Sequence, residues 1–331
     1  MKTTLEEADS IKSNFELMNK ALSRVIVGQT ELIRNIYIAI LCGGHVLIEG
    51  VPGLGKTLIV KTLSRILDLK YSRIQFTPDL MPADILGTNI VNEDEKGNRY
   101  FEFYKGPIFG QIILADEINR ATPKTQSALL EAMQEEKVTV FGTEYALEPP
   151  FVVLATQNPL EMEGTYPLPE AQVDRFFFKL KVTYPTPDQL MEIIEKTTEE
   201  EEPELTKVMD PESILKMKVL VRQTPVAEHV KHYAIRLVMA THPGNGYYIK
   251  RTGMYVHYGS SPRGVQTLIR AGKVSALLNG RYNVSLEDIR EMARPALRHR
   301  IIMNLRAEAE GIDADEIIQD ILKGVPERVR D

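Results

Sequence analysis

A glycine-rich loop constrains the fold of this chain more than any other feature of its sequence. The run Gly50-Val51-Pro52-Gly53-Leu54-Gly55-Lys56-Thr57 has the spacing G-x-x-x-x-G-K-[ST]. Glycines let a backbone wrap closely around a bound group, because no Cβ obstructs the approach. A helix that begins at the end of the loop would add free N–H groups and the positive end of its dipole. The run therefore predicts a loop that binds a polyphosphate.

The residues on either side of this loop favour the same prediction. The apolar run His45–Glu49 precedes it as a buried strand would, and Thr57–Leu67 has the composition of a helix, with Leu58 in its first turn. Lys56 would bring a mobile charge to the β- and γ-phosphates, and the hydroxyl of Thr57 would bind a magnesium ion. We therefore expect ATP and Mg2+ as the ligands.

Two halves of the chain differ in their hydrophobic pattern. In the first half, short apolar runs alternate with helical stretches, which predicts an α/β fold with a parallel sheet covered on both faces. The runs are His45–Glu49, Tyr71–Phe76, Gln111–Ala115, Phe151–Ala155 and Phe176–Val182. From about residue 188 onward, helical periodicity dominates. The prolines of Tyr184-Pro185-Thr186-Pro187 interrupt any helix, so we expect a nucleotide-binding core over residues 1–185 and a helical domain over residues 186–331.

Capping residues mark three helix starts in the second half. They are Ser261 before Pro262, Ser285 with Asp288, and Asp313 with Glu316, and Gly324 marks the end of the last helix. The acidic run Glu199–Glu202 is expected to be a solvated helix end or loop.

Composition and charge count against several classes of protein. The formal net charge is -6, which is not the electrostatic footprint of a duplex nucleic-acid binder. The single cysteine, Cys42, cannot form an internal disulfide. Residues 1–20 contain no signal-peptide pattern, and apolar runs such as Ile36–Cys42 are far shorter than a membrane span. We expect a cytoplasmic protein without membrane insertion.

Two of the predicted strands end in polar residues that could complete an ATP site. Asp116 and Glu117 follow Gln111–Ala115. Downstream of a phosphate loop, Asp116 would hold Mg2+ through water and Glu117 would orient or deprotonate the attacking water. On its own the pair could be a solvated strand end. Asn158 follows Phe151–Ala155 and could bind the attacking water or the γ-phosphate, or serve only as a turn residue before proline.

These motifs resemble those of the AAA+ ATPases, and within them the MoxR family, from about Val25 to Leu322. The resemblance lies in the phosphate loop and in a set of shorter stretches. They are Ile26–Gln29, Phe76–Leu80, Asp84–Gly87, Ala115–Ala121, Ala155–Pro159, Pro169–Phe176, Ser261–Arg263 and Leu297–Arg300. The resemblance implies a five-stranded parallel AAA+ core with β-hairpin insertions, followed by a helical lid domain.

The resemblance also assigns roles to residues at matching positions. It implies that Val27 and Gly28 line the adenine pocket, that Asn158 is sensor 1, and that Arg263 is sensor 2, which reaches from the lid to the γ-phosphate. Arg175 is similar to the arginine finger, which enters the site of the neighbouring subunit. Two alternatives stay open: Arg175 could form a surface salt bridge, and Arg120 could be the residue that acts in trans.

The hairpin insertions of the family correspond to Asn89–Tyr104 and to Val138–Glu148 around Gly142. The segment Gly244–Tyr258 is longer than usual for the family and rich in tyrosine. We expect a lid β-hairpin that turns at Arg251-Thr252-Gly253, or a subunit contact; stacking on nucleic acid is the alternative.

The resemblance implies a ring-forming ATPase, expected to be a hexamer, that remodels or activates partner proteins. The family favours partners with von Willebrand factor A domains. The alternatives are a nucleic-acid-stimulated AAA+ motor, a magnesium-chelatase-like subunit, and a scaffold that binds ATP but scarcely hydrolyses it. The net negative charge counts against a nucleic-acid partner, and the presence of Glu117, Asn158 and Arg175 counts against the scaffold.

Overall fold

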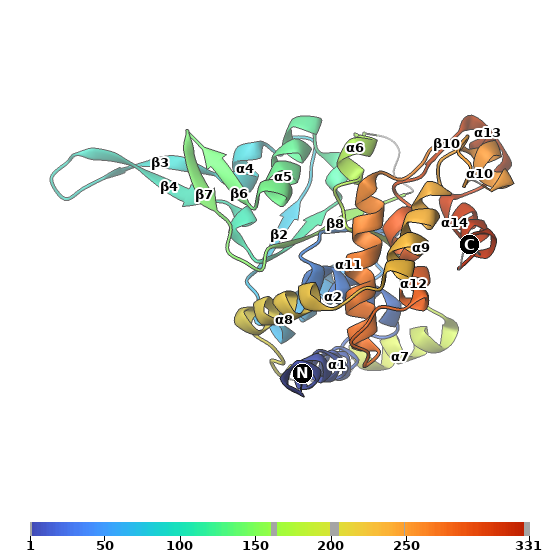
Figure 1. The fold of residues 1–331 in the computed structure, drawn as a ribbon. Helices are drawn as coiled ribbons and strands as arrows, with labels where there is room; N and C mark the ends of the chain where they lie inside the picture. Colours follow the sequence, from blue (N-terminus) through green and yellow to red (C-terminus); the bar gives the residue numbers. More distant parts are fainter. Residues whose placement is uncertain (1, 160–163, 199–204, 248, 328–331) are drawn as a thin grey trace.

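The computed structural model describes residues 2–159, 164–198, 205–247 and 249–327. A five-stranded parallel sheet, with strand order β2-β5-β8-β1-β9, lies at the centre of the first half (Figure 1). Its strands are β1 (Val46–Glu49), β2 (Tyr71–Gln75), β5 (Ile112–Asp116), β8 (Val152–Gln157) and β9 (Phe178–Lys181). Each falls within or overlaps one of the predicted apolar runs, so the predicted sheet is confirmed.

Side chains of the central strands alternate between two hydrophobic cores. Val46 and Ile48 of β1 join the core formed with helices α2 (Thr30–Cys42) and α3 (Lys56–Ile66). Leu47 between them joins the core on the other face, which includes α5 (Pro123–Glu135). This alternation follows from the two-residue period of a strand. Because both faces of the sheet are buried, successive residues of a central strand must be apolar, which explains the continuous apolar runs in the sequence. The loop Gly50–Thr57 connects β1 to α3 at the carboxyl edge of this sheet.

Both predicted hairpin insertions are present. β3 (Gly87–Glu93) pairs with β4 (Arg99–Lys105), and β6 (Lys137–Val140) pairs with β7 (Thr143–Ala146), each antiparallel. In Figure 1 both project from the same side of the molecule, away from the sheet. A Cβ at Gly87, where φ is 104°, would lie 2.3 Å from the carbonyl oxygen of Tyr104, so the close approach of the two strands requires glycine there.

The second half is mainly helical, as predicted. Its helices are α7 (Pro187–Thr198), α8 (Pro211–Gln223), α9 (Glu228–Met239), α10 (Lys250–Tyr255), α11 (Pro262–Leu278), α12 (Leu286–Leu297), α13 (Leu305–Glu310) and α14 (Ala314–Gly324). The predicted caps hold: Ser261 accepts from the N–H of Arg263, Ser285 and Asp288 form a capping box, and Asp313 accepts from the N–H of Glu316. α14 ends at Gly324.

The two halves share one hydrophobic core. Ile36 and Ile40 of α2 belong to the same buried cluster as Leu277 of α11 and Met292 of α12. The N-terminal helix α1 (Lys2–Leu22) also contributes to it through Met18. The division at residues 185 and 186 therefore stays a prediction, because packing is continuous across the two halves.

The prediction of a β-hairpin over Gly244–Tyr258 is wrong. The proposed turn lies inside helix α10, and the chain then enters β10 (Val256–Tyr258), which pairs antiparallel with β11 (Ile302–Met303). Contacts outside the segment override the turn tendency of Gly253: Arg251 forms ion pairs with α14, and the hydroxyl of Tyr255 donates to Glu310 at 2.6 Å. Tyr248 and the acidic run Glu199–Glu202 lie outside the described residues.

Among the described residues, no helix combines the length and the apolar character that a bilayer crossing requires.

Candidate nucleotide-binding site

The backbone of the loop between β1 and α3 is shaped to leave open space in front of it. Gly53 and Gly55 have φ values of 83° and 75°, and a Cβ at either position would meet no atom within 4 Å. Gly55 precedes the first residue of α3, and no side chain caps the helix there. The N-terminal end of α3, which carries the positive end of the helix dipole, therefore lies at the end of the loop, as in a phosphate-binding loop. The ammonium of Lys56 donates to the carbonyl of Gly50 at 2.6 Å, across the loop.

A cavity of about 440 Å³ adjoins this loop. Its walls come from the loop, from the segment before α2 and from α7. The lining residues include Val25, Val27, Gln29, Pro52, Leu54, Leu58, Tyr184, Leu190 and Thr197. Since most of these side chains are apolar or aromatic, the cavity suits a planar base with few polar contacts. Val27 and the loop residues expected around the nucleotide therefore meet at one cavity.

Gly28 contributes to this region through its backbone. Its φ is 67°, and a Cβ there would lie 2.7 Å from the amide nitrogen of Gln189 on α7. The neighbouring Gln29 donates from its side chain to the carbonyl of Thr183 at 2.9 Å. Both contacts join the segment before α2 to the linker and helix that follow β9. Gly28 itself is not among the residues that line the cavity, and the left-handed conformation of its backbone is what favours glycine there.

The carboxylate of Asp116 is held by two donors at the end of β5. The hydroxyl of Thr156 on β8 donates to Oδ1 at 2.6 Å, and a guanidinium nitrogen of Arg73 on β2 donates to Oδ2 at 2.7 Å. Thr156 also accepts the backbone N–H of Glu117 at 2.8 Å. One hydroxyl on the neighbouring strand therefore orients both acidic residues.

Glu117 adopts a left-handed backbone conformation with a φ of 57°, directly after β5 ends. Its Oε2 accepts from the side-chain amide of Gln75 at 2.9 Å and from Arg120 at 2.9 Å. A non-glycine residue with positive φ is uncommon and often marks a functional position. Arg120, the alternative residue for action in trans, is therefore ion-paired to the acidic residue of its own chain.

Three polar residues in this network, Arg73, Gln75 and Thr156, were not among the predicted site residues. Arg73 and Gln75 flank the buried Ile74 on the edge strand β2, and Gln75 lies opposite Asp116 in the parallel register. Polar residues two positions apart in a strand share one face. That spacing could have indicated that Arg73 and Gln75 act together, but the sequence does not show that β5 is the strand beside them.

Asn158 follows β8 and is buried, with 7% of its surface exposed. The N–H of Gly50 donates to the carbonyl of Gln157 at 3.2 Å, so the end of β8 lies directly beside the start of the phosphate loop. The structure thus brings Asn158 to the same edge of the sheet as the loop and the acidic pair.

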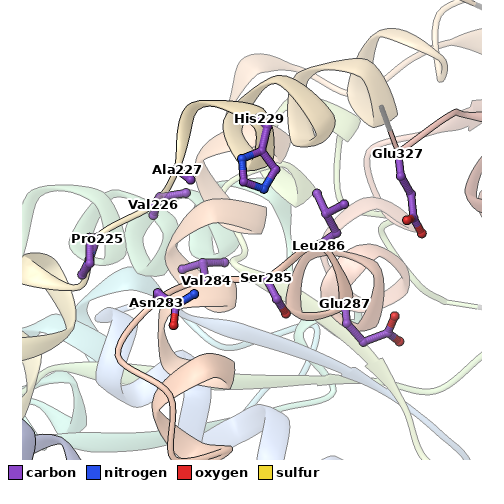
Figure 2. A pocket seen from close by; sticks show the side chains of 10 residues that line it. All are labelled: Pro225, Val226, Ala227, His229, Asn283, Val284, Ser285, Leu286, Glu287 and Glu327. Carbon is purple, nitrogen blue, oxygen red and sulfur yellow. The ribbon is translucent and has the colours of Figure 1, made fainter. Parts of the chain in front are cut away.

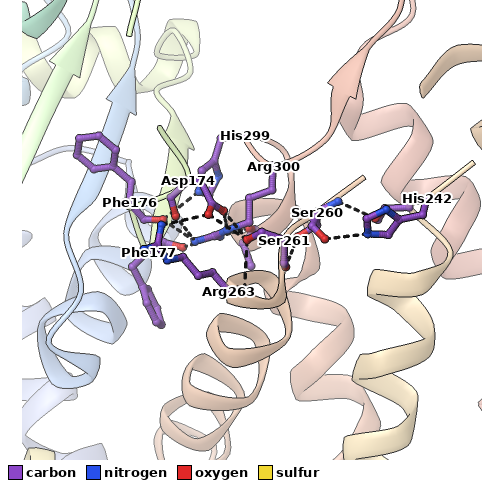
Figure 3. A network of polar contacts seen from close by, with 11 residues as sticks. Asp174, Phe176, Phe177, His242, Ser260, Ser261, Arg263, His299 and Arg300 are labelled. Carbon is purple, nitrogen blue, oxygen red and sulfur yellow. Dashed lines mark hydrogen bonds and ion pairs between the residues drawn. The ribbon is translucent and has the colours of Figure 1, made fainter. Parts of the chain in front are cut away.

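The two predicted arginines lie farther along the chain and contact other elements. Arg175 donates to the carbonyl of Leu130 on α5, the helix that covers the opposite face of the sheet from α3, at 3.3 Å. Arg263, in the first turn of α11, forms an ion pair with Asp174 at 3.2 Å (Figure 3). The sensor 2 candidate therefore lies beside the residue that precedes the finger candidate.

A second cavity, of about 630 Å³, lies in the helical half where α9 and α12 begin (Figure 2). Its lining includes Val226, His229, Ser285 and Glu327. The residues predicted for nucleotide binding are not part of this lining, so the cavity beside the phosphate loop is the candidate site.

Comparisons with known proteins show the family to which this chain is related. Residues 45–178 match the ATPase family associated with various cellular activities (AAA), and residues 249–321 match the AAA lid domain. The chain is 39% identical over 321 residues to Chaperone MoxR1 of Mycobacterium tuberculosis, covering 96% of this chain and 84% of that protein. It is 32% identical over 329 residues to Protein MoxR of Methylorubrum extorquens, covering 94% and 93%. A crystal structure from Cytophaga hutchinsonii superposes with a TM-score of 0.92 at 44% identity, covering 98% of both chains.

Proposed function

Because this chain belongs to the MoxR family of AAA+ ATPases, we propose that it binds Mg-ATP at the loop Gly50–Thr57 and hydrolyses it as one subunit of a hexameric ring. The observation that carries this proposal is a convergence. The open-faced loop, the acidic pair Asp116 and Glu117, and Asn158 all lie at the carboxyl edge of one parallel sheet, which is where such sheets bind ligands.

The loop supplies the phosphate contacts. Main-chain N–H groups around Gly53 and Gly55 and at the start of α3 would bind phosphate oxygens, since a Cβ at either glycine would meet no atom within 4 Å. Lys56 would exchange the carbonyl of Gly50 for the β- and γ-phosphates, because a charged acceptor is a stronger partner than a neutral one. Val27, Pro52 and Leu58 would enclose the adenine in the adjoining cavity.

The hydroxyl of Thr57 would bind Mg2+, and the carboxylate of Asp116 would hold the ion through water. The ion, when bound, neutralises charge on the phosphate oxygens. Thr156 keeps one oxygen of Asp116 oriented, while the ion pair with Arg73 is half-exposed and therefore easily displaced by a dication.

Glu117 would orient the attacking water and accept its proton, and Asn158 would hold the same water or the γ-phosphate. Gln75 and Arg120 fix the carboxylate of Glu117 in the observed orientation. Arg175 would enter the neighbouring site and stabilise charge in the transition state. The ion pair between Arg120 and Glu117 within one chain favours Arg175 over Arg120 for this role.

Movement of the lid is the mechanical output of this cycle. Arg263 would contact the γ-phosphate from the lid, so loss of that phosphate changes the equilibrium between lid and core positions. The relative from Mycobacterium tuberculosis is named a chaperone, which supports a remodelling role. Proteins with von Willebrand factor A domains are the proposed partners, and the cytoplasm is the proposed location.

A nucleic-acid-stimulated motor or a magnesium-chelatase-like subunit is the alternative. The segment Gly244–Tyr258 was the feature that favoured nucleic acid, yet its Arg251 forms ion pairs with Glu316 and Asp320. Phosphate release measured with and without single- or double-stranded DNA distinguishes a nucleic-acid-stimulated motor from a protein remodeller. We expect equal rates in all three conditions. A rate that rises several-fold with DNA would support the motor instead.

A further inference from the structure

A polar joint between the lid and the core surrounds Asp174, the residue directly before Arg175 (Figure 3). Oδ1 of Asp174 accepts from the Nε of Arg300 at 2.9 Å and from the hydroxyl of Ser261 at 2.8 Å. Oδ2 accepts from Arg263 at 3.2 Å. All three donors belong to the lid, so one carboxylate of the core is held by three lid side chains.

Arg300 also binds the backbone on both sides of Arg175. Its Nη2 donates to the carbonyl of Asp174 at 3.2 Å and to the carbonyl of Phe176 at 2.7 Å, and Nη1 donates to the carbonyl of Phe177 at 3.3 Å. Only 2% of the Arg300 side chain is exposed. A buried guanidinium with this many acceptors has one well-defined geometry. The lid therefore fixes the short segment that carries Arg175.

The contact of Arg263 with Asp174 is of a different kind. The Arg263 side chain is 47% exposed and has one ion-pair contact with Asp174, and ion pairs of this kind contribute little net free energy. If Arg263 leaves, Asp174 keeps Arg300 and Ser261. Arg263 can thus leave Asp174 for another partner, whereas Arg300 stays bound to Asp174.

We propose that Asp174 is a positioning residue for Arg175. Through Asp174 and Arg300, the lid of one subunit would fix the position of the Arg175 side chain that enters the nucleotide site of the neighbouring subunit. This inference rests on the proposed function, in which Arg175 acts in trans. Movement of Arg263 from Asp174 to a γ-phosphate removes one positive charge from the joint. The nucleotide state of one site is in this way passed to the neighbouring site.

Mixed rings test this role separately from any effect on the subunit's own site. Acceptor subunits carry Arg175→Ala and keep an intact nucleotide site. Donor subunits carry Lys56→Ala and supply Arg175. A second donor carries Lys56→Ala and Asp174→Asn, which keeps the size of the side chain and an oxygen for Arg300 but removes the charge. We expect ATP turnover recovered with this donor to fall at least about tenfold, because small displacements of a catalytic group are costly. Since both donors are inactive in their own sites, such a fall reflects only what they supply to a neighbour.

A matched control lies at a separate contact between the lid and the core. Asp315 binds Arg298 at 2.9 Å and Lys181 at 2.9 Å. A donor with Lys56→Ala and Asp315→Asn should recover turnover to within about twofold of the simple donor, since independent sites rarely couple. Chromatography of each mixture monitors ring assembly. If the Asp174→Asn donor does not assemble, Ser261→Ala in the same background gives a milder reading, with an expected fall of about threefold.

The outcomes distinguish the role of Asp174 from the role of Arg175. Full recovery with an assembled Asp174→Asn or Ser261→Ala donor overturns the role of Asp174 and leaves Arg175 as the residue acting in trans. No recovery with the simple Lys56→Ala donor overturns both.

Discussion

The side-chain amide of Gln75 donates a 2.9 Å hydrogen bond to the carboxylate of Glu117. Gln75 belongs to the edge strand β2 and lies opposite Asp116 in the register of β2 and β5. An edge strand thus positions the residue that we assign to the attacking water, and Arg73 on the same strand holds Asp116.

Replacement of Gln75 tests this positioning. Gln75→Ala should lower ATP turnover about tenfold and leave the affinity for Mg-ATP unchanged, because a misaligned general base affects the chemical step and not ground-state binding. Steady-state kinetics give kcat and KM. Ser72→Ala, on the other face of β2, is the control and should match wild type. A change in KM alone for Gln75→Ala would refute the positioning role.

Removal of the loop lysine should abolish tight nucleotide binding. Lys56→Ala is expected to weaken Mg-ATP binding about a hundredfold or more, since a charged hydrogen bond to phosphate contributes a few kcal/mol. Calorimetric titration measures the affinity directly. Lys61→Ala, an exposed lysine on α3, serves as the control. Equal affinity of Lys56→Ala and wild type would contradict the phosphate-binding role of the loop.

Arg175 and Arg120 are distinguished by how their variants respond to mixing. Arg175→Ala should lower turnover about a thousandfold, the typical effect of a missing arginine finger. Addition of excess Lys56→Ala subunits should restore part of that activity. Arg120→Ala should not be restored by the same donor, because Arg120 contacts Glu117 within its own chain. The opposite pattern would assign the trans role to Arg120.

Buried His45 makes stability depend on pH. Its Nδ1 accepts the N–H of Val153 and its Nε2 faces the carbonyl of Met133, and burial lowers its pKa from 6.5 to about 4. The unfolded chain therefore binds the proton more readily, and stability falls as the pH drops below 6.5 toward 4. Between about pH 7 and about pH 5 this one group accounts for about 2 kcal/mol.

His45→Asn removes the titration while keeping an acceptor and a donor. Urea unfolding at the two pH values should show a shallower pH dependence for this variant than for wild type. The pKa of the buried His299 is also lowered by burial, so part of the dependence should persist. An unchanged pH dependence in His45→Asn would contradict the contribution of His45.

Residue type and spacing along the chain were sufficient to predict the elements that depend on neighbouring residues. The apolar runs identified all strands of the main sheet, and the loop and the acidic pair were found from residue type and spacing. The contacts of Gln75, Thr156 and Asp174 were not predictable, because they depend on which strands are neighbours and how the lid docks. α10 shows the same limit: its ion pairs with α14 join residues 65 or more apart in the chain.

Glu117→Gln separates ATP binding from hydrolysis when affinity and phosphate release are measured in the same preparation. The amide keeps the size of the side chain but cannot accept a proton. We predict affinity for Mg-ATP equal to wild type and phosphate release at least about a hundredfold slower, the typical contribution of a general base. Phosphate release at the wild-type rate from this variant would contradict this prediction.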